Sequence, residues 1–366
     1  MRMVLTGGGT GGHIYPALAV AGALRAIDPG ISITYVGTSG GLEADLVKGQ
    51  GLDFRVVSSR GILGKSPRAA LAGAAAAARG VFEAVSLLRR LRPSAVLGTG
   101  GYVSGPVVLA AALLGIPRAI QEQNAVPGFT NRALGLVANR VFTAFEGTSG
   151  FPASKVVVTG NPVRAEILRA TRDDSARSLG VDPARRTLCI FGGSRGARSI
   201  VNAGIRLVSQ GLGSDSQIIF VTGKEYYESA SEALASRRIG GGGAGNTILI
   251  PYMYNMEAAL ACADLALCRA GGMAVAEMAA RGLPAILVPS PNVANNHQEY
   301  NARALAAEGA AVIVREGPGF EDRVVNEVTA LWNDRKRLES MKVAARAAGR
   351  PHAASEIARG LLAMSR

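Results

Sequence analysis

The sequence contains few cysteines, histidines and aromatic residues for its length. Its 366 residues include three cysteines, three histidines and one tryptophan. Cys189, Cys262 and Cys268 stand in apolar stretches and lack the close spacing of metal ligands. We therefore expect reduced, buried thiols of a cytoplasmic protein, which excludes a disulfide-stabilised scaffold and a cysteine-based metal site.

Long hydrophobic runs are also absent. The run at residues 69–78 is short and mostly alanine, so it predicts no membrane-spanning helix. A glycine cluster at residues 7–12 stands where the apolar region of a secretory signal would begin. We therefore expect the chain to stay on the side of the membrane where it is made.

Acidic residues are in deficit. The chain has 40 lysines and arginines against 27 aspartates and glutamates, a net charge of +13. This balance favours polyanionic partners such as nucleic acid, acidic lipid or phosphorylated ligands; the alternative is a generally basic solvated surface. Basic patches with interleaved aromatic residues and known nucleic-acid motifs are lacking, so we expect no nucleic-acid partner.

Short apolar runs alternate with helical stretches along the whole chain, a pattern typical of parallel α/β sheets. Strands are expected at residues 3–5, 31–36, 54–57, 95–97, 140–143 and 156–158, and then at 188–191, 217–222, 247–250, 265–268, 284–288 and 311–314. The pattern thus begins again in the second half. It predicts two Rossmann-like, doubly wound parallel-sheet domains that face each other across a cleft.

The domain boundaries follow from turn signals. We expect a first domain at 1–160, a second at 161–349, and a C-terminal helix at 350–366 that packs back on the first domain. The segment "TGNPVR" (159–164) predicts a hinge, since Asn-Pro favours a turn. The segment "GGGGAG" (240–245) predicts a mobile loop inside the second domain.

The opening stretch "TGGGTGGHIYPALAV" (6–20) places glycines between a strand and a helix for which Pro16 is a suitable first residue. Glycine permits positive φ, and a helix N-terminus attracts anions. Gly7, Gly9 and Gly12 also fit the dinucleotide fingerprint. However, the second strand ends in "TYVGTSGG" without the acidic residue that holds a ribose. A nicotinamide-dependent oxidoreductase is therefore disfavoured.

Three more glycine-rich loops follow predicted strands, at 98–106, 192–198 and 267–277. One glycine turn in an α/β protein is usually only a turn. Four such loops lie at the carboxyl ends of strands, where these sheets bind ligands. Together they favour a phosphate-rich or sugar-rich ligand.

The motifs taken together carry a resemblance that covers residues 7–302. The segments are "GGTGGHIYPALAVA", "GTGGYVSGP", "QEQNAVPGFTNR", "GNPVR", "GGSRGARSIVN", "CRAGGMAVAEMAARGLPAILVP" and "HQEYNA". They resemble the UDP-N-acetylglucosamine transferases of bacterial peptidoglycan synthesis, which are GT-B glycosyltransferases.

This resemblance implies inverting transfer of N-acetylglucosamine from UDP-N-acetylglucosamine to the 4-hydroxyl of undecaprenyl-diphospho-N-acetylmuramoyl-pentapeptide. It implies no cofactor and no metal. The first domain would face the acceptor lipid and the membrane, and the second would bind the UDP-sugar. The enzyme would be peripheral, on the cytoplasmic face of the membrane. The alternative is another GT-B enzyme of UDP-sugars, such as an epimerase or a transferase with a soluble acceptor.

The resemblance also implies the substrate-binding residues. They are Thr10, Gly11, Gly12, Asn124, Arg164, Ser194, Tyr252, Met253, Gly272, Met273, Ala274, Val275, Ala276, Glu277, His297 and Gln298. The residue types suit the chemistry. Arg164 offers a forked donor to a diphosphate, and the carboxylate of Glu277 suits two ribose hydroxyls. The alternative for Glu277 is an acid in the first turn of a helix, favoured by the helix dipole.

Some positions depart from the family pattern. Ala274 replaces a frequent threonine, Gln121 a frequent histidine, and Tyr252 and Asn255 stand where phenylalanine and aspartate are common. These departures alter only the finer contacts to diphosphate and uracil.

His13 is the expected general base, because imidazole titrates near neutral pH. The alternatives are that His13 caps the helix or contacts a phosphate. Tyr102 and Glu122 are further acceptor-side residues. A DxD-like metal pair is not evident, so helix N-termini and Arg164 are expected to stabilise the leaving diphosphate.

Residues 60–92 predict a basic amphipathic helix. They hold seven basic residues and one acid, Glu83. The basic residues are Arg60, Lys65, Arg68, Arg79, Arg89, Arg90 and Arg92; the apolar ones between them are Leu71, Val81, Phe82, Val85 and Leu88. Such a helix can lie on an anionic bilayer. The alternative is a core-packed helix with ordinary surface arginines.

Overall fold

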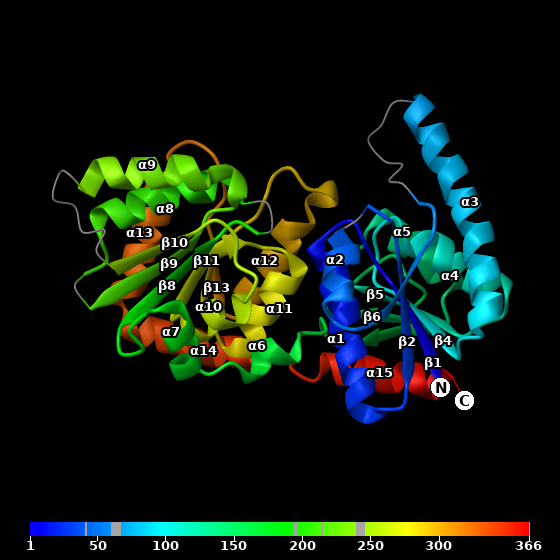
Figure 1. The fold of residues 1–366 in the computed structure, drawn as a ribbon. Helices are drawn as coiled ribbons and strands as arrows, with labels where there is room; N and C mark the ends of the chain where they lie inside the picture. The colour runs from blue at the N-terminus through cyan, green and yellow to red at the C-terminus, as the bar shows by residue number, and fades with distance from the viewer. Residues whose placement is uncertain (41, 60–66, 194–195, 214, 239–245, 366) are drawn as a thin grey trace. The chain divides into compact units, whose positions relative to one another are not determined.

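The computed structural model describes residues 1–40, 42–59, 67–193, 196–213, 215–238 and 246–365. The chain divides into two compact units (Figure 1). Unit 1 comprises Met1–Arg164 and Arg350–Arg366, and unit 2 comprises Ala165–Gly349. Each unit is a parallel sheet covered by helices on both faces, so the prediction of two doubly wound α/β domains is confirmed.

Unit 1 is built on a seven-stranded sheet in the order β3-β2-β1-β4-β5-β6-β7, with every pair parallel. The strands are β1 (Arg2–Thr6), β2 (Ser32–Gly37), β3 (Asp53–Val56), β4 (Ala95–Gly98), β5 (Arg118–Glu122), β6 (Arg140–Thr143) and β7 (Val156–Val158). The helices are α1 (Gly11–Ile27), α2 (Leu42–Lys48), α3 (Pro67–Leu91), α4 (Ser104–Leu113), α5 (Phe129–Val137), the short η1 (Ala153–Lys155) and α15 (Ala353–Met364).

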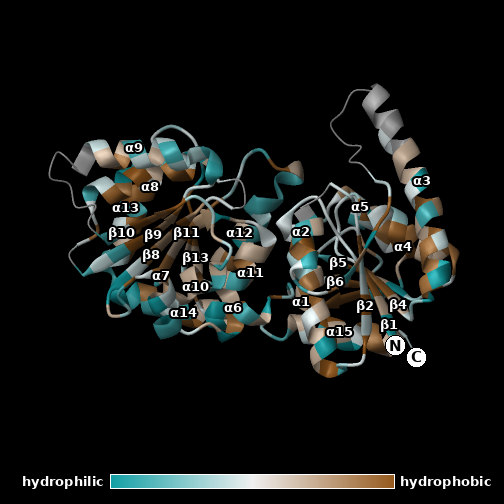
Figure 2. Cartoon of the chain, viewed as in Figure 1, coloured by the Kyte–Doolittle hydropathy of each residue, from teal (hydrophilic) through white to brown (hydrophobic). Residues whose placement is uncertain are grey.

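Alternating residues of the central strand β1 supply the two cores of unit 1, because successive side chains of a strand point to opposite faces. Met3 and Leu5 pack with α1 and α15, whereas Val4 packs with the helices α3, α4 and α5. The C-terminal helix α15 inserts Ile357 and Leu361 into the first of these cores. The central strands β1 and β4 are accordingly mostly hydrophobic (Figure 2).

Unit 2 has a six-stranded parallel sheet in the order β10-β9-β8-β11-β12-β13. The strands are β8 (Arg186–Phe191), β9 (Ser216–Val221), β10 (Thr247–Ile250), β11 (Leu265–Arg269), β12 (Ala285–Val288) and β13 (Ala311–Ile313). The helices are α6 (Ala165–Arg169), α7 (Arg172–Leu179), α8 (Arg198–Gln210), η2 (Lys224–Tyr226), α9 (Tyr227–Arg238), α10 (Met256–Cys262), α11 (Gly272–Arg281), η4 (Ala294–Asn296), α12 (His297–Ala307), α13 (Phe320–Asn333) and α14 (Arg335–Ala348). Its largest core surrounds Trp332, against β8, β9 and β11.

Two local expectations were wrong. Strand β5 (Arg118–Glu122) was not predicted, because only Ala119 and Ile120 in it are apolar. Helix α1 begins at Gly11 and not at Pro16, which lies inside the helix. The glycine-rich segment 240–245 falls outside the described residues.

The expected burial of the three cysteines is confirmed, since all are buried and free. Burial raises the pKa of the Cys189 thiol to about 12, so this thiol is protonated and unreactive at neutral pH. Across the described ranges, none of the helices combines the length and the apolar character needed to cross a membrane.

Candidate functional site

In unit 1, two glycine-rich loops meet where the strand order reverses, between β1 and β4. Such a switch point is where doubly wound sheets bind ligands. A Cβ atom added at Gly7 would lie 2.1 Å from the hydroxyl oxygen of Thr99, and one at Gly101 would lie 2.1 Å from the carbonyl oxygen of Gly8. The two loops therefore approach as closely as they do only because these positions are glycine.

His13 lies in the first turn of α1, half-buried between these loops. Its Nδ1 atom is 3.1 Å from the carbonyl oxygen of Thr99. A carbonyl oxygen only accepts hydrogen bonds, so this contact requires a proton on Nδ1; a neutral imidazole with that proton has its lone pair on Nε2. The hydroxyl of Thr99 also donates to the backbone oxygen of His13 at 2.6 Å. Thr10, not His13, is the N-cap residue of α1, which removes the capping alternative for His13.

Glu122 ends strand β5 and is 1% exposed. One carboxylate oxygen accepts from the backbone N–H and the side-chain amide of Asn124, at 2.9 and 3.1 Å. The other accepts from the backbone N–H of Gly128 at 3.1 Å and from the Asn131 amide at 2.9 Å. Glu122 thus shapes the loop that carries Asn124.

Tyr102 and Arg164 also belong to unit 1. The Tyr102 ring lies against Gly9, whose φ is +87°, and a Cβ atom at Gly9 would be 2.9 Å from that ring. The Arg164 guanidinium stacks over the ring of Tyr15, 4.7 Å from its centroid. This cation–π contact limits the rotamers of the arginine that is expected to bind diphosphate.

In unit 2, the strand order reverses between β8 and β11. Helix α11 begins at Gly272 directly after the β11 loop, without a side-chain cap and without an acidic residue in its first turn. No acidic residue of that turn therefore offsets the positive end of its dipole. Glu277 lies further along and is half-buried. The alternative that Glu277 is a first-turn acid is therefore wrong.

The other predicted donor-site residues of unit 2 lie at the start of α12 and on the loop between β10 and α10. Asn295 and Asn296 adopt left-handed φ values of 55° and 51° before α12 begins at His297. Gln298 Oε1 accepts from the backbone N–H of Ser290 at 2.9 Å, so its NH₂ group is directed elsewhere as a donor. Tyr252 packs edge-to-face on Tyr254, with ring centroids 4.7 Å apart.

The remaining predicted residues differ in their burial. Met253 is buried, and so are Gly272, Met273 and Val275. Gly11 is buried, Gly12 is exposed, and Ala274 and Ala276 are half-buried. Ser194 lies outside the described residues. The predicted set thus falls into a group in unit 1 and a group in unit 2.

Sequence reasoning missed several residues that hold these loops. The carbonyl oxygen of Thr99 contacts the His13 ring, and Gln123 donates to that same oxygen. Arg269 ends β11 and pairs with Glu316 at 2.7 Å, while also donating to Ser199 at 3.2 Å. A charged residue at the end of an apolar strand, as in "LCRAGG", is the signal that would have identified Arg269.

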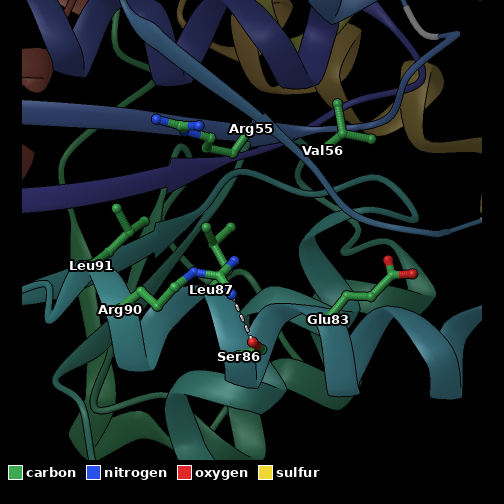
Figure 3. A pocket seen from close by; sticks show the side chains of 7 residues that line it. All are labelled: Arg55, Val56, Glu83, Ser86, Leu87, Arg90 and Leu91. Carbon is green, nitrogen blue, oxygen red and sulfur yellow. Dashed lines mark hydrogen bonds between the residues drawn. The ribbon is translucent and has the colours of Figure 1, made fainter.

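Helix α3, which covers most of the predicted membrane segment, has both buried and exposed side chains. In α3, Leu88 is buried and Val85 packs against the core, so these two do not form an outer stripe. Phe82 is 77% exposed. A cavity of 560 Å³ lies between α3 and β3 and is lined by Arg55, Val56, Glu83, Ser86, Leu87, Arg90 and Leu91 (Figure 3). Arg90 Nη1 donates to Ser86 Oγ at 3.0 Å at its edge.

Glu83 lies at one end of this cavity. It accepts from the backbone N–H of Ser58 at 2.6 Å and from Arg79 at 2.8 Å. These contacts, that of Ser58 first, lower the pKa of Glu83 below its ordinary value. The carboxylate therefore ties α3 to the segment that follows β3.

Named relatives match this chain along almost its whole length. A protein of Moorella thermoacetica named UDP-N-acetylglucosamine--N-acetylmuramyl-(pentapeptide) pyrophosphoryl-undecaprenol N-acetylglucosamine transferase is 45% identical over 365 residues, covering 99% of this chain and 98% of the relative. A protein of the same name from Desulforudis audaxviator is 45% identical over 361 residues, covering 98% of this chain and 96% of that relative.

Solved structures give the same result. The crystal structure of Acinetobacter baumannii MurG matches with a TM-score of 0.76 and 32% identity, over 99% of both chains. A UDP-GlcNAc 2-epimerase from Neisseria meningitidis matches with a TM-score of 0.73 over 99% of this chain and 100% of that chain, but at 15% identity it shares the fold alone.

Two family models cover most of the chain. The glycosyltransferase family 28 N-terminal domain matches residues 3–143, and the glycosyltransferase family 28 C-terminal domain matches residues 187–357. The predicted resemblance is confirmed: the chain belongs to glycosyltransferase family 28.

Proposed function

We propose that this protein transfers N-acetylglucosamine from UDP-N-acetylglucosamine to the 4-hydroxyl of undecaprenyl-diphospho-N-acetylmuramoyl-pentapeptide in peptidoglycan synthesis. The observation that carries this proposal is 45% identity along 98% of a relative named for this transfer. The glycine loops at both switch points support a nucleotide-sugar ligand.

The reaction proposed is a single displacement with inversion. His13 Nε2 takes the proton of the acceptor hydroxyl while that oxygen attacks the anomeric carbon of the donor sugar. The bond from this carbon to the diphosphate oxygen breaks, and UDP leaves with the electron pair. The carbonyl oxygen of Thr99, 3.1 Å from Nδ1, then stabilises the imidazolium that forms.

Two features are proposed to stabilise the negative charge that develops on the leaving diphosphate. The Arg164 guanidinium, held over Tyr15, offers planar paired donors. The N-terminus of α11, which begins at Gly272, presents backbone N–H groups and a partial positive charge.

The remaining residues are proposed to select the donor. Glu277 accepts hydrogen bonds from the two ribose hydroxyls. Gln298, with its oxygen engaged by Ser290, offers its NH₂ group to a sugar oxygen. Asn124 contacts the acetamido group or a sugar hydroxyl from its loop next to Glu122.

We further propose that α3 docks peripherally on the anionic cytoplasmic face of the membrane. Phe82 is exposed, and three exposed arginines lie along the same helix: Arg79, Arg89 and Arg90. Each basic group near an anionic surface contributes about 1 kcal/mol. Among the described side chains of α3, Phe82 is the large apolar one that stays exposed and can contact lipid.

The test measures UDP release from UDP-N-acetylglucosamine with and without a short-chain acceptor-lipid analogue. Release that depends on the analogue, with a β-linked disaccharide product seen by NMR, is the expected result. Conversion of the UDP-sugar without acceptor would favour an epimerase. Absence of release with the analogue present would refute the transfer.

A further inference from the structure

The peptide group between Thr99 and Gly100 stands beside His13 at the end of β4. It is followed by two glycines in left-handed conformations, Gly100 with φ of +100° and Gly101 with φ of +76°. Glycine crosses between backbone conformations at low cost because it has no Cβ atom. Backbone sterics alone therefore do not determine where the Thr99 carbonyl points, although that carbonyl accepts from the His13 ring.

Two buried side chains hold this peptide group at its two ends. Gln123 Nε2 donates to the carbonyl oxygen of Thr99 at 2.6 Å. The N–H of Gly100 donates to Ser104 Oγ at 3.1 Å. Gln123 is 2% exposed and Ser104 is fully buried, so water does not compete for these bonds.

The orientation of the Gln123 amide follows from its partners. Its NH₂ group donates to the Thr99 carbonyl and to the side-chain oxygen of Gln121, the latter at 2.6 Å. Both partners are acceptors, so the amide cannot be reversed without losing both bonds. Gln121 in turn donates to Asn161 at 2.8 Å, and Asn161 donates back to the Gln123 carbonyl at 2.9 Å.

This orientation leaves the Gln123 side-chain oxygen buried and without a hydrogen-bond partner among the described residues. A buried polar atom without a partner destabilises the fold. Gln123 therefore keeps its hydrogen bond to Thr99 although its own side-chain oxygen stays without one.

We propose that Gln123 is a positioning residue for the transfer reaction. It holds the Thr99 carbonyl where that oxygen keeps the His13 proton on Nδ1, so that Nε2 is the basic nitrogen. This inference rests on the proposed function, in which His13 is the general base. Gln123 itself touches no reacting atom and acts only through Thr99.

The test compares Gln123→Met with a matched control, Gln217→Met. Methionine has nearly the same length and cannot donate a hydrogen bond. Gln217 is a buried glutamine of unit 2, 6% exposed, that donates to the Asp182 carbonyl at 2.7 Å and to Thr187 at 2.8 Å. The two variants thus lose similar bonds, but only one of them lies near His13.

The decisive readout is the tautomer of His13, from ¹⁵N–¹H correlation spectra of the imidazole rings. The chain has only three histidines, and the His13 signals are assigned by their loss in His13→Gln. His297 is an internal reference, because its Nδ1 atom lies 2.9 Å from the Ala294 carbonyl in unit 2. The spectra need no substrate.

In the wild type and in Gln217→Met, the His13 ring should be the Nδ1–H tautomer. In Gln123→Met it should become a mixture of tautomers while His297 is unchanged. kcat should then fall on the order of 10²-fold relative to the control, as expected for a misplaced catalytic group, with KM for UDP-N-acetylglucosamine unchanged. Gln123→Glu, which keeps a polar side chain but cannot donate as a carboxylate, should behave in the same way.

Two results would overturn the inference: an Nδ1–H tautomer retained in both Gln123 variants, or a kcat equal to that of Gln217→Met. Failure of the proposed function would look different. The wild type would then show no transfer, while the spectra would still report whether Gln123 orients the ring.

Discussion

Replacing Gly101 by alanine should damage the site more than any other glycine-to-alanine change at a matched conformation. Gly101 has φ of +76°, which alone costs alanine about 1–2 kcal/mol. In addition, its new Cβ atom would lie 2.1 Å from the backbone oxygen of Gly8. Neither atom belongs to a flexible side chain, so the two loops must separate, at a further cost of about 1–3 kcal/mol.

Gly115 provides the control. Its φ is +68°, and a Cβ atom there would meet nothing within 4 Å. Gly115→Ala should therefore cost only the conformational term of about 1–2 kcal/mol. Gly101→Ala should cost about 2–5 kcal/mol, the sum of both terms. At about 2–4 °C per kcal/mol, thermal unfolding separates the two variants.

Activity should separate them more clearly. Moving the β1 loop away from the β4 loop displaces His13 from Thr99, so kcat/KM should fall on the order of 10²-fold in Gly101→Ala. Gly115→Ala should keep wild-type kcat/KM, because Gly115 precedes β5 at the opposite end of the sheet. Equal losses of stability and activity in the two variants would refute the argument from close approach.

Three further predictions concern the proposed roles. His13→Ala should lower kcat by about 10²–10⁴-fold with UDP affinity kept; a normal kcat with weaker UDP binding in calorimetry would make His13 a phosphate contact. Glu277→Ala should weaken UDP binding by about 1.5–3 kcal/mol through lost charge-assisted hydrogen bonds, and unchanged affinity would exclude the ribose contact. Reversing the three exposed arginines of α3 to glutamate should abolish sedimentation with anionic vesicles. Phe82→Ser should weaken binding to neutral and anionic vesicles alike, whereas Val343→Ser, at another exposed apolar position in unit 2, should change neither. Vesicle binding that survives the arginine reversal would remove α3 from the membrane surface.

The fold was predictable where apolar runs coincide with strands. Most strands of both sheets were expected from such runs, because strands buried on both faces are continuously hydrophobic. Strand β5 was not predicted, because its residues Gln121 and Glu122 are polar yet buried. Hydrogen bonds offset the cost of burying them, from Gln121 to Asn161 and from Asn131 to Glu122. The hydrogen bond between Gln121 and Asn161 spans 40 residues, and such a pairing leaves no local pattern.

The candidate site was predictable to a similar extent. Glycine loops after strands indicate a switch point, because glycine is the residue that permits close backbone approach. The sequence did not indicate that Thr99 contacts His13, because every residue has a backbone carbonyl group. The direction of this carbonyl depends on Gln123 and Ser104. The expectation for α3 was incomplete because a helical stripe of apolar residues does not reveal which part of it faces the core.

The place of α15 in the chain has a consequence for biosynthesis. Unit 1 is discontinuous: Ile357 and Leu361 complete a core that begins with Met3 and Leu5. Unit 2 is one continuous segment and can fold as soon as it has been translated. Unit 1 is complete only once α15 has also been made, because Ile357 and Leu361 belong to its core. The half of the protein that is made first is therefore the half that is completed last.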